Sequence, residues 1–212
     1  MPSPLREPKQ ARSRQARALI LDSTLECLVD LGFGGTTTVA VCARAGVSRG
    51  ALLHHFPTRA QLLCESVGHV FEEMRREFQS HFSGVLKLDM ALPRLVDHVV
   101  DEIWRVYGDR RLGAVLELYV AARTDPDLRV ALQPVSAAHR ERSLSIARLI
   151  FQSHVAAGED FEDRLCLALD GLQGLALRLS VNPDRPERTL RAAKGLLRGA
   201  LLDSDGDNGA QT

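Results

Sequence analysis

Hydrophobic positions recur at helical spacing along most of the chain. In residues 11–31, apolar and small side chains fall on one helical face, whose members are Ile20, Thr24, Cys27, Leu28 and Leu31. The same spacing predicts further helices at residues 38–45, 48–55, 58–82, 89–107, 110–123, 126–156, 161–181 and 186–202. No segment alternates between apolar and polar residues for long enough to predict a strand. The pattern therefore predicts an all-α protein of about nine helices.

Short polar residues and glycines mark where these helices begin and end. Gly32 follows the first helix and is expected to end it in a left-handed conformation. Gly46 breaks the second helix and provides the positive φ that a tight turn requires. The residues placed to cap the next three helices through their hydroxyl groups are Thr37, Ser48 and Thr58. Gln61 would complete a capping box with Thr58.

The predicted elements divide the chain into four parts. Residues 1–10 contain three prolines and are expected to form a flexible basic arm. Residues 11–57 are expected to form a helix-turn-helix domain, and residues 58–202 a larger helical domain. Residues 203–212 are polar and rich in glycine, which predicts a disordered tail.

Charge is distributed unevenly, although the formal net charge is zero. Residues 1–60 carry eight Lys or Arg and four acidic side chains, whereas residues 61–212 carry 19 basic and 23 acidic ones. A basic module on an acidic body is typical of a protein whose first part binds DNA. A chance distribution of surface charge explains the same numbers, so charge alone does not decide.

The unit at residues 37–56 has the length of a helix-turn-helix. Small and medium apolar side chains would let its two helices pack closely: Val41, Cys42, Ala45, Val47 and Leu52. The residues expected to face outward are Arg49, Gly50, Ala51 and His54. Ser48 leaves the start of the second helix exposed, which suits an approach to phosphates. Plain helical hairpins share this pattern, so it is weak evidence by itself.

The residues from Gly32 to Leu63, GFGGTTTVAVCARAGVSRGALLHHFPTRAQLL, resemble the N-terminal signature of the tetracycline-repressor (TetR) family. The matching landmarks are Gly32-Phe33, Thr36-Thr37, Ala45-Gly46-Val47-Ser48, Gly50, Leu52, His55-Phe56 and Leu62-Leu63. With the first helix, the resemblance covers about a quarter of the chain. The remaining three quarters match in the number and length of helices alone.

The resemblance implies a sequence-specific DNA-binding regulator, a repressor that a small molecule releases from a palindromic operator. Thr37 and Thr38 would meet phosphate, and Arg59 would do so where the family usually has Lys. Base edges would be contacted by Arg49, Gly50 and Ala51, and base or backbone by His54. His55 would hold the recognition helix. Leu53 stands where the family usually has Tyr, so one hydroxyl contact to phosphate is absent. Cys42 stands where the family usually has Ala, a mild change in the core.

Residues 60–202 contain no catalytic motif, which predicts that the protein is not an enzyme and uses no cofactor. Apolar faces near the C-terminus predict a homodimer interface made by Leu165, Leu169, Leu172, Leu190, Leu197 and Leu201; these faces could equally be internal core. A pocket for a small-molecule effector is expected around Trp104, Tyr107, Leu116, Tyr119, Val120 and Phe151. Aromatic residues at helical spacing are, however, more often core than pocket.

Cysteine usage and hydropathy limit the location and the chemistry. The four cysteines, Cys27, Cys42, Cys64 and Cys166, are far apart, which predicts buried free thiols and no metal site. The sequence predicts neither a secretory signal nor a membrane span, hence a cytoplasmic protein without a membrane partner. Two other function classes stay open: an all-helical enzyme or lipid-binding protein, and an adaptor that binds another regulator. The exposed Arg49 and the basic arm disfavour the adaptor.

Overall fold

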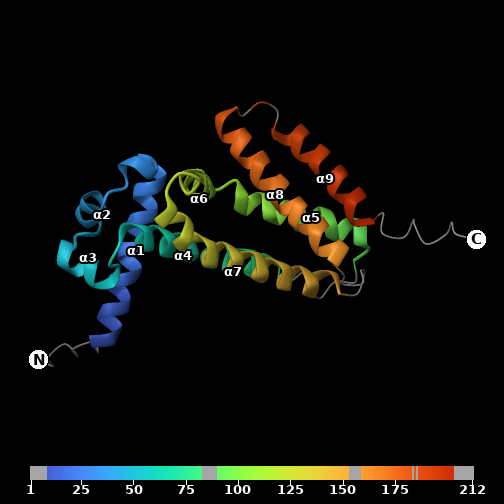
Figure 1. Ribbon diagram of the computed structural model, residues 1–212. Helices are drawn as coiled ribbons and strands as arrows, with labels where there is room; N and C mark the ends of the chain where they lie inside the picture. The colour runs from blue at the N-terminus through green and yellow to red at the C-terminus, as the bar shows by residue number, and fades with distance from the viewer. Residues whose placement is uncertain (1–8, 83–89, 153–158, 183, 185, 203–212) are drawn as a thin grey trace, which may run out of the picture. The chain divides into compact units, whose positions relative to one another are not determined.

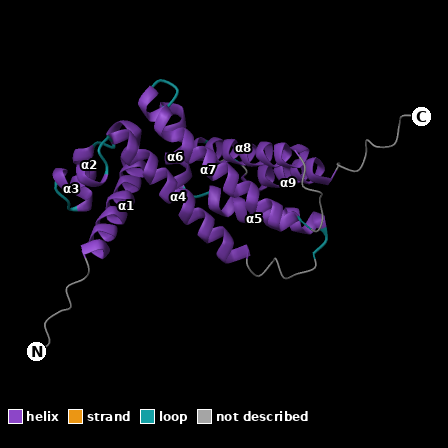
Figure 2. Ribbon diagram, turned by 60° about the horizontal axis from the view of Figure 1, so that its bottom comes forward, coloured by secondary structure: helices purple, strands orange, loops and turns teal. Residues whose placement is uncertain are grey.

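A computed structural model of the chain describes residues 9–82, 90–152, 159–182, 184 and 186–202 (Figure 1). These residues form nine α helices and no strand (Figure 2), which confirms the predicted all-α class. The helices are α1 (Lys9–Gly35), α2 (Thr38–Ala45), α3 (Arg49–His55), α4 (Arg59–Phe82), α5 (Leu92–Tyr107), α6 (Arg110–Ala121), α7 (Pro126–Phe151), α8 (Glu159–Val181) and α9 (Pro186–Leu202). None of the helices in these ranges is both long and apolar enough to cross a bilayer.

Several predicted boundaries differ from those observed. The expected arm at residues 1–10 already becomes helical at Lys9, and residues 1–8 lie outside the described residues. Helix α5 begins at Leu92, where Pro93 occupies the first turn and needs no intrahelical partner. Helix α7 ends at Phe151, five residues before the predicted end at residue 156. The predicted tail at residues 203–212 lies outside the described part.

Gly32 interrupts α1. Its φ of 69° is positive, as the sequence predicts, but its ψ of −179° is extended and is not that of a left-handed helical cap. A short helical turn of residues 33–35 follows before the chain enters α2. The carbonyl oxygen of Gly32 accepts two hydrogen bonds from Thr36, from the backbone N–H at 3.1 Å and from the hydroxyl at 2.7 Å.

The chain divides into two compact units. The first unit comprises the described residues up to Phe71 together with residues 114–135, and the second comprises residues 72–113 and the described residues from 136 onward. Helices α4, α6 and α7 contribute segments to both units. This division is not the one at residue 58 that we expected from the sequence.

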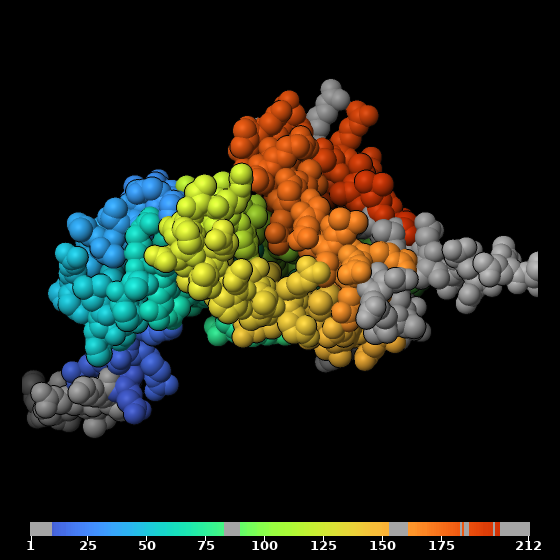
Figure 3. Space-filling model, viewed as in Figure 1, coloured from blue at the N-terminus to red at the C-terminus, as the bar shows by residue number. Residues whose placement is uncertain are grey.

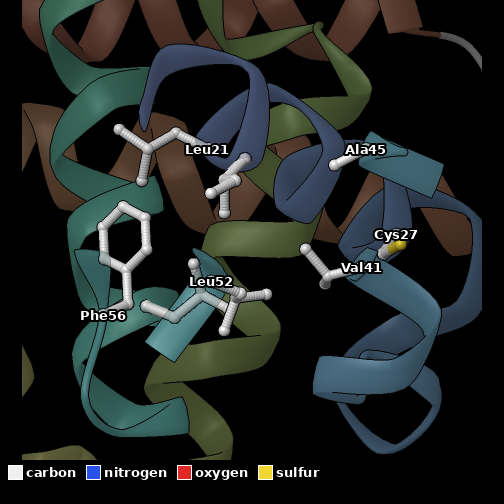
Figure 4. Close-up of a cluster of buried hydrophobic side chains, with 8 residues drawn as sticks. Leu21, Cys27, Val41, Ala45, Leu52 and Phe56 are labelled. Atoms are coloured by element: carbon white, nitrogen blue, oxygen red, sulfur yellow. The ribbon is translucent and has the colours of Figure 1, made fainter. Parts of the chain in front are cut away.

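The core of the first unit joins α1, α2 and α3. Side chains from these helices and the start of α4 face one another in a buried cluster (Figure 4), which contains Ile20, Leu21, Cys27, Val41, Ala45, Leu52, Phe56 and Leu62. The predicted apolar face of α1 is confirmed at Ile20, Thr24, Cys27 and Leu28, all of which are buried. It is wrong at Leu31, which is 50% exposed. Leu31 directly precedes Gly32, the residue at which α1 is interrupted.

The second unit is built on α5, α8 and α9, which contact one another pairwise. Helices α8 and α9, orange and red in Figure 3, lie side by side. Two ion pairs join α9 to α5, one between Lys194 and Asp101 and the other between Arg198 and Asp97. Since the partners on each helix are four residues apart, the two pairs fix one relative register of α5 and α9.

Candidate nucleic-acid interface

Local hydrogen bonds shape the helix-turn-helix as the sequence predicts. The Thr37 hydroxyl accepts from the backbone N–H of Ala40 at 3.1 Å, and the Ser48 hydroxyl accepts from Ala51 N–H at 3.2 Å. Gly46 adopts φ 64° and ψ 31°, the left-handed conformation that ends α2. Each of the two short helices is therefore capped by its own sequence.

Helix α3 has one buried and one open side. Leu52 and the following Phe56 are fully buried, whereas Arg49, Gly50, Ala51 and His54 are exposed. Within the described residues Arg49 makes no hydrogen bond or ion pair, so its guanidinium is available to a ligand. A Cβ atom added at Gly50 would meet only the Ser48 hydroxyl, at 3.9 Å. The first turns of α3 thus present backbone and one arginine to solvent.

The two threonines at the start of α2 differ in accessibility. Thr37 is exposed, but its hydroxyl already caps the helix, and Thr38 is half-buried. A hydroxyl that accepts from Ala40 still has its own proton to donate, so Thr37 remains able to donate to phosphate. Val39 and Leu53 add exposed apolar surface, at 71% and 39%.

Arg59 occupies a different environment from the one that the resemblance implies. Its Nε donates to the carbonyl oxygen of Thr36 at 3.0 Å and its Nη2 to that of Phe33 at 2.5 Å. The guanidinium also lies 4.4 Å from the centre of the Phe33 ring. Arg59 therefore holds residues 33–36, at the end of α1, and its guanidinium is turned toward the chain itself.

Other basic side chains of the first unit are also engaged within the chain. Arg17 pairs with Glu65 and lies 5.4 Å from the centre of the Phe56 ring. Arg44 pairs with Asp30 at 2.9 Å, and this hydrogen bond raises the pKa of the guanidinium. The basic excess counted in the sequence is thus partly neutralised by internal pairs, while Arg12 and Arg49 remain exposed.

Sequence reasoning missed Glu117, a residue of α6 in the first unit. Its Oε1 accepts from the backbone N–H of Phe33 at 2.8 Å. The partners are 84 residues apart in the chain, and a backbone N–H gives no signal in a sequence. Nothing in the pattern around Glu117 distinguishes it from an ordinary surface carboxylate.

Comparison with known proteins decides the family. Residues 20–65, which contain the two capped helices and the start of α4, match the family of bacterial regulatory proteins named tetR. The chain belongs to the TetR family. It is a helix-turn-helix transcriptional regulator that binds DNA.

Relatives of this TetR-family chain resemble it over most of their length. The HTH-type transcriptional regulator CymR of Pseudomonas putida is 27% identical over 176 residues, which are 83% of this chain and 85% of that protein. A solved transcriptional regulator from Rhodococcus sp. Rha1 has a TM-score of 0.65 at 20% identity and covers 88% of this chain and 95% of its own. The multidrug binding protein EbrR, solved with imidazole, has a TM-score of 0.60 at 22% identity over 87% of this chain and 93% of its own. The two structures are similar to this chain in fold.

The second unit of this TetR-family chain contains a small apolar cavity. It has a volume of about 20 Å³ and is lined by Val96, Val99, Val100, Ile103, Phe151, Leu165, Ala168, Leu169 and Leu172. Phe151 is the one predicted pocket residue among them. Trp104 is half-buried in the same unit, and the hydroxyl of the buried Tyr107 accepts from the Gln173 side chain at 3.3 Å. The remaining candidates, Leu116, Tyr119 and Val120, belong to the first unit, and Val120 is 58% exposed.

The leucines predicted for the dimer interface lie in different environments. Leu165 and Leu172 are buried inside the chain, with 5% and 2% exposure, and together with Leu169 they line the cavity. A side chain so enclosed offers little surface to a partner. Leu190 is half-buried, and the side chains of Leu197 and Leu201 lie outside the described residues.

Burial shifts the pKa of several groups of the regulator. It raises the pKa of the buried Cys27 and Cys166 thiols, and it raises that of Cys64 to about 11, with a smaller effect from Asp125. Cys42 is only partly buried. In α7, burial lowers the pKa of His139 to about 4, and the nearby Arg142 acts in the same direction.

Proposed function

We propose that this regulator is a homodimeric repressor that binds a palindromic operator and releases it when a small molecule binds the second unit. The open side of α3 is the observation that carries the proposal. Arg49 stands on a short helix whose opposite side, Leu52, is fully buried, so the core fixes its position. A DNA target would place the protein in the cytoplasm.

In the proposed complex, α3 enters the major groove. Arg49 would donate to a guanine edge or a phosphate, and Gly50 and Ala51 would allow the backbone to approach the bases. His54, exposed one turn later, and the hydroxyls of Thr37, Thr38 and Ser48 would contact the flanking backbone. Exposed Arg12 adds a charge that strengthens binding at low salt.

We infer that the dimer forms through the outward stripe of α8. Exposed residues follow one another there at helical spacing: Leu167, Gly171, Gly174, Leu177 and Val181. Leu167, Leu177 and Val181 are 73%, 43% and 83% exposed, and a continuous apolar stripe of this kind is typical of a surface that a partner covers. A Cβ atom added at Gly171 or Gly174 would meet nothing within 4 Å, so a second helix has room to approach closely.

We propose that the effector binds at the apolar cavity beside Phe151, which widens to accept it. At about 20 Å³ the cavity has room for little more than one water-sized molecule, so an effector must push the lining side chains apart. A ligand that prefers the widened form would shift the population of the dimer toward it. Operator affinity then falls if that form spaces the two α3 helices differently from the ~34 Å between successive major grooves.

The test is selection of binding sites from random duplex DNA with the purified protein, followed by titration of the selected sequence at two salt concentrations. We expect a palindromic sequence with half-sites about one helical turn apart. Arg49→Ala should remove most of the preference for this sequence. Arg123→Ala, which removes an equally exposed charge from the same unit outside α2 and α3, should leave it unchanged.

Two outcomes would contradict the proposal. No enriched sequence, or an affinity that disappears at modest salt, would mean that the helix-turn-helix is a scaffold and that the helical body deserves a search for catalysis or lipid binding. Enrichment that survives Arg49→Ala would mean that the reading surface lies elsewhere on the first unit.

A further inference from the structure

Residues 33–36, which form the end of α1 and the turn toward α2, are held by two side chains of opposite charge. Phe33 is the residue on which both act: Glu117 accepts from its N–H at 2.8 Å, and Arg59 donates to its carbonyl oxygen at 2.5 Å. The two side chains come from α6 and α4, far from this segment in the chain. Both polar atoms of one backbone residue are thus fixed from outside α1.

Gly32 makes the contact with Glu117 possible. A Cβ atom at position 32 would lie 2.9 Å from Oε1 of Glu117, closer than side chains tolerate. The positive φ of 69° at Gly32 also turns the chain so that the next N–H points at the carboxylate. The glycine therefore serves two purposes, a backbone conformation and the close approach of an acceptor.

Residues 33–36 lead directly into α2, which is followed by α3. Thr36, buried at 1% exposure, is tied to Gly32 by its N–H and its hydroxyl and to Arg59 by its carbonyl. The next residue, Thr37, caps α2. Helix α2 in turn packs on α3 in the buried cluster that includes Val41 and Leu52. A shift of the backbone at Phe33 would therefore displace the start of α2, and α3 with it.

We propose that Glu117 is a positioning residue for operator binding, through which α6 sets the placement of α2 and α3. The inference rests on the proposed function of α3 and deepens it, because it names the contact that regulates the reading surface. Glu117 touches no DNA in this proposal. It acts through the Phe33 N–H alone, and its own side chain is exposed.

The sign of the effect separates positioning from simple electrostatics. Glu117 is an acidic residue in a unit that binds a polyanion. If charge alone mattered, its removal would strengthen binding to every DNA sequence. If positioning matters, removal weakens binding to the operator while leaving binding to unrelated duplex unchanged or stronger.

The experiment uses the full-length protein with three variants. Glu117→Ala removes the acceptor, Glu117→Gln keeps an oxygen acceptor without the charge, and Glu26→Gln is the control. Glu26 is an exposed acid of the same unit, and its described ion pair is with Arg44 at 4.0 Å. Arg44 keeps Asp30 as a closer partner, at 2.9 Å, when Glu26 is replaced. Each variant is titrated with the selected operator and with an unrelated duplex, and its urea midpoint is measured.

We expect Glu117→Ala to weaken operator binding about fivefold to tenfold, as for loss of one hydrogen bond. Glu117→Gln should restore most of the affinity, and Glu26→Gln should not weaken it. The amide resonance of Phe33 should move in both Glu117 variants and stay unchanged in the control. Unchanged or tighter operator binding by Glu117→Ala would overturn the inference, as would an equal loss on both duplexes.

The failure of this inference can be distinguished from failure of the proposed function. If the wild-type protein selects no operator, the function of α3 is wrong. If the wild type binds its operator and the Glu117 variants bind it equally well, only the positioning role is wrong. If Glu117→Ala lowers the urea midpoint, its operator affinity is judged against that of Glu117→Gln, whose side chain has the same shape as the wild-type glutamate.

Discussion

Arg59 binds Phe33 in two ways at once, with its guanidinium 4.4 Å from the ring centre and one of its nitrogens donating to the carbonyl oxygen of the same residue. A second nitrogen donates to Thr36. The planar guanidinium can satisfy these contacts together, whereas a lysine ammonium carries its donors on one atom. An arginine at position 59 therefore makes contacts that a lysine could not make together.

Arg59→Ala should lower the free energy of unfolding by roughly 1–3 kcal/mol, because two hydrogen bonds and the ring contact disappear. Since Arg59 is turned toward Phe33 and Thr36, the salt dependence of operator binding should keep its slope even if the affinity falls. Arg49→Ala should do the reverse: it lowers the slope by about one and leaves the stability unchanged. Urea unfolding and titrations over a salt series measure the two quantities, and a lowered slope in Arg59→Ala would show a phosphate contact.

Gly174→Arg tests the outward stripe of α8. A Cβ atom at position 174 would meet nothing within 4 Å, so the new side chain has room where it leaves the helix. We therefore expect a folded protein whose sedimentation mass falls from that of a dimer to that of the 23.3 kDa chain. Gly113→Arg is the matched control, an exposed helical glycine of α6 with equally open surroundings. A dimer that survives Gly174→Arg would place the interface on another surface.

We expect one of the four cysteine thiols to react quickly with a thiol reagent and the other three to react slowly. The thiolate is the reactive form, so the raised pKa values of Cys27, Cys64 and Cys166 and their burial both slow the reaction with a thiol reagent. Cys42 is partly exposed and should react first. In Cys42→Ser the fast phase should disappear, while all remaining thiols react in denaturant. A fast phase that persists would mean that a buried cysteine becomes exposed by local opening.

His139 makes stability depend on pH. Its folded pKa is about 4, below the ordinary value of 6.5. Between these values the unfolded chain binds a proton that the folded chain does not, so stability falls as pH decreases from about 6.5 toward 4. The slope from this group is at most about 1.4 kcal/mol per pH unit. His139→Gln should flatten the stability curve in this window without affecting it above pH 7, and an unchanged curve would mean that His139 titrates normally.

Local sequence was enough to predict how the reading helices are built. Thr37, Gly46 and Ser48 act on neighbours within four residues, and such contacts leave a readable pattern. The capping box at Thr58 is half realised, because the Gln61 N–H donates to the Thr58 hydroxyl while the Gln61 side chain donates to Glu65 instead.

Contacts between distant segments were not predictable in the same way. The family resemblance implies a phosphate contact for Arg59, whereas its contacts within the chain depend on the path of residues 33–36, which no local pattern fixes. Leu165 and Leu172 were assigned to an interface because α8 is apolar on several sides, so periodicity could not distinguish the inner side from the outer one. Glu117 was overlooked because its partner is a backbone atom.

Phe33 contacts Arg59 through its ring and Glu117 through its backbone N–H, so different substitutions at position 33 remove the two contacts. The ring contact with Arg59 is lost with any aliphatic residue at position 33. The hydrogen bond to Glu117 needs only a backbone N–H, which nineteen of the twenty amino acids provide and proline alone does not. Replacement of Phe33 by an aliphatic residue would therefore break the ring contact with Arg59 and leave the link to α6 in place, whereas proline would break that link by removing its donor.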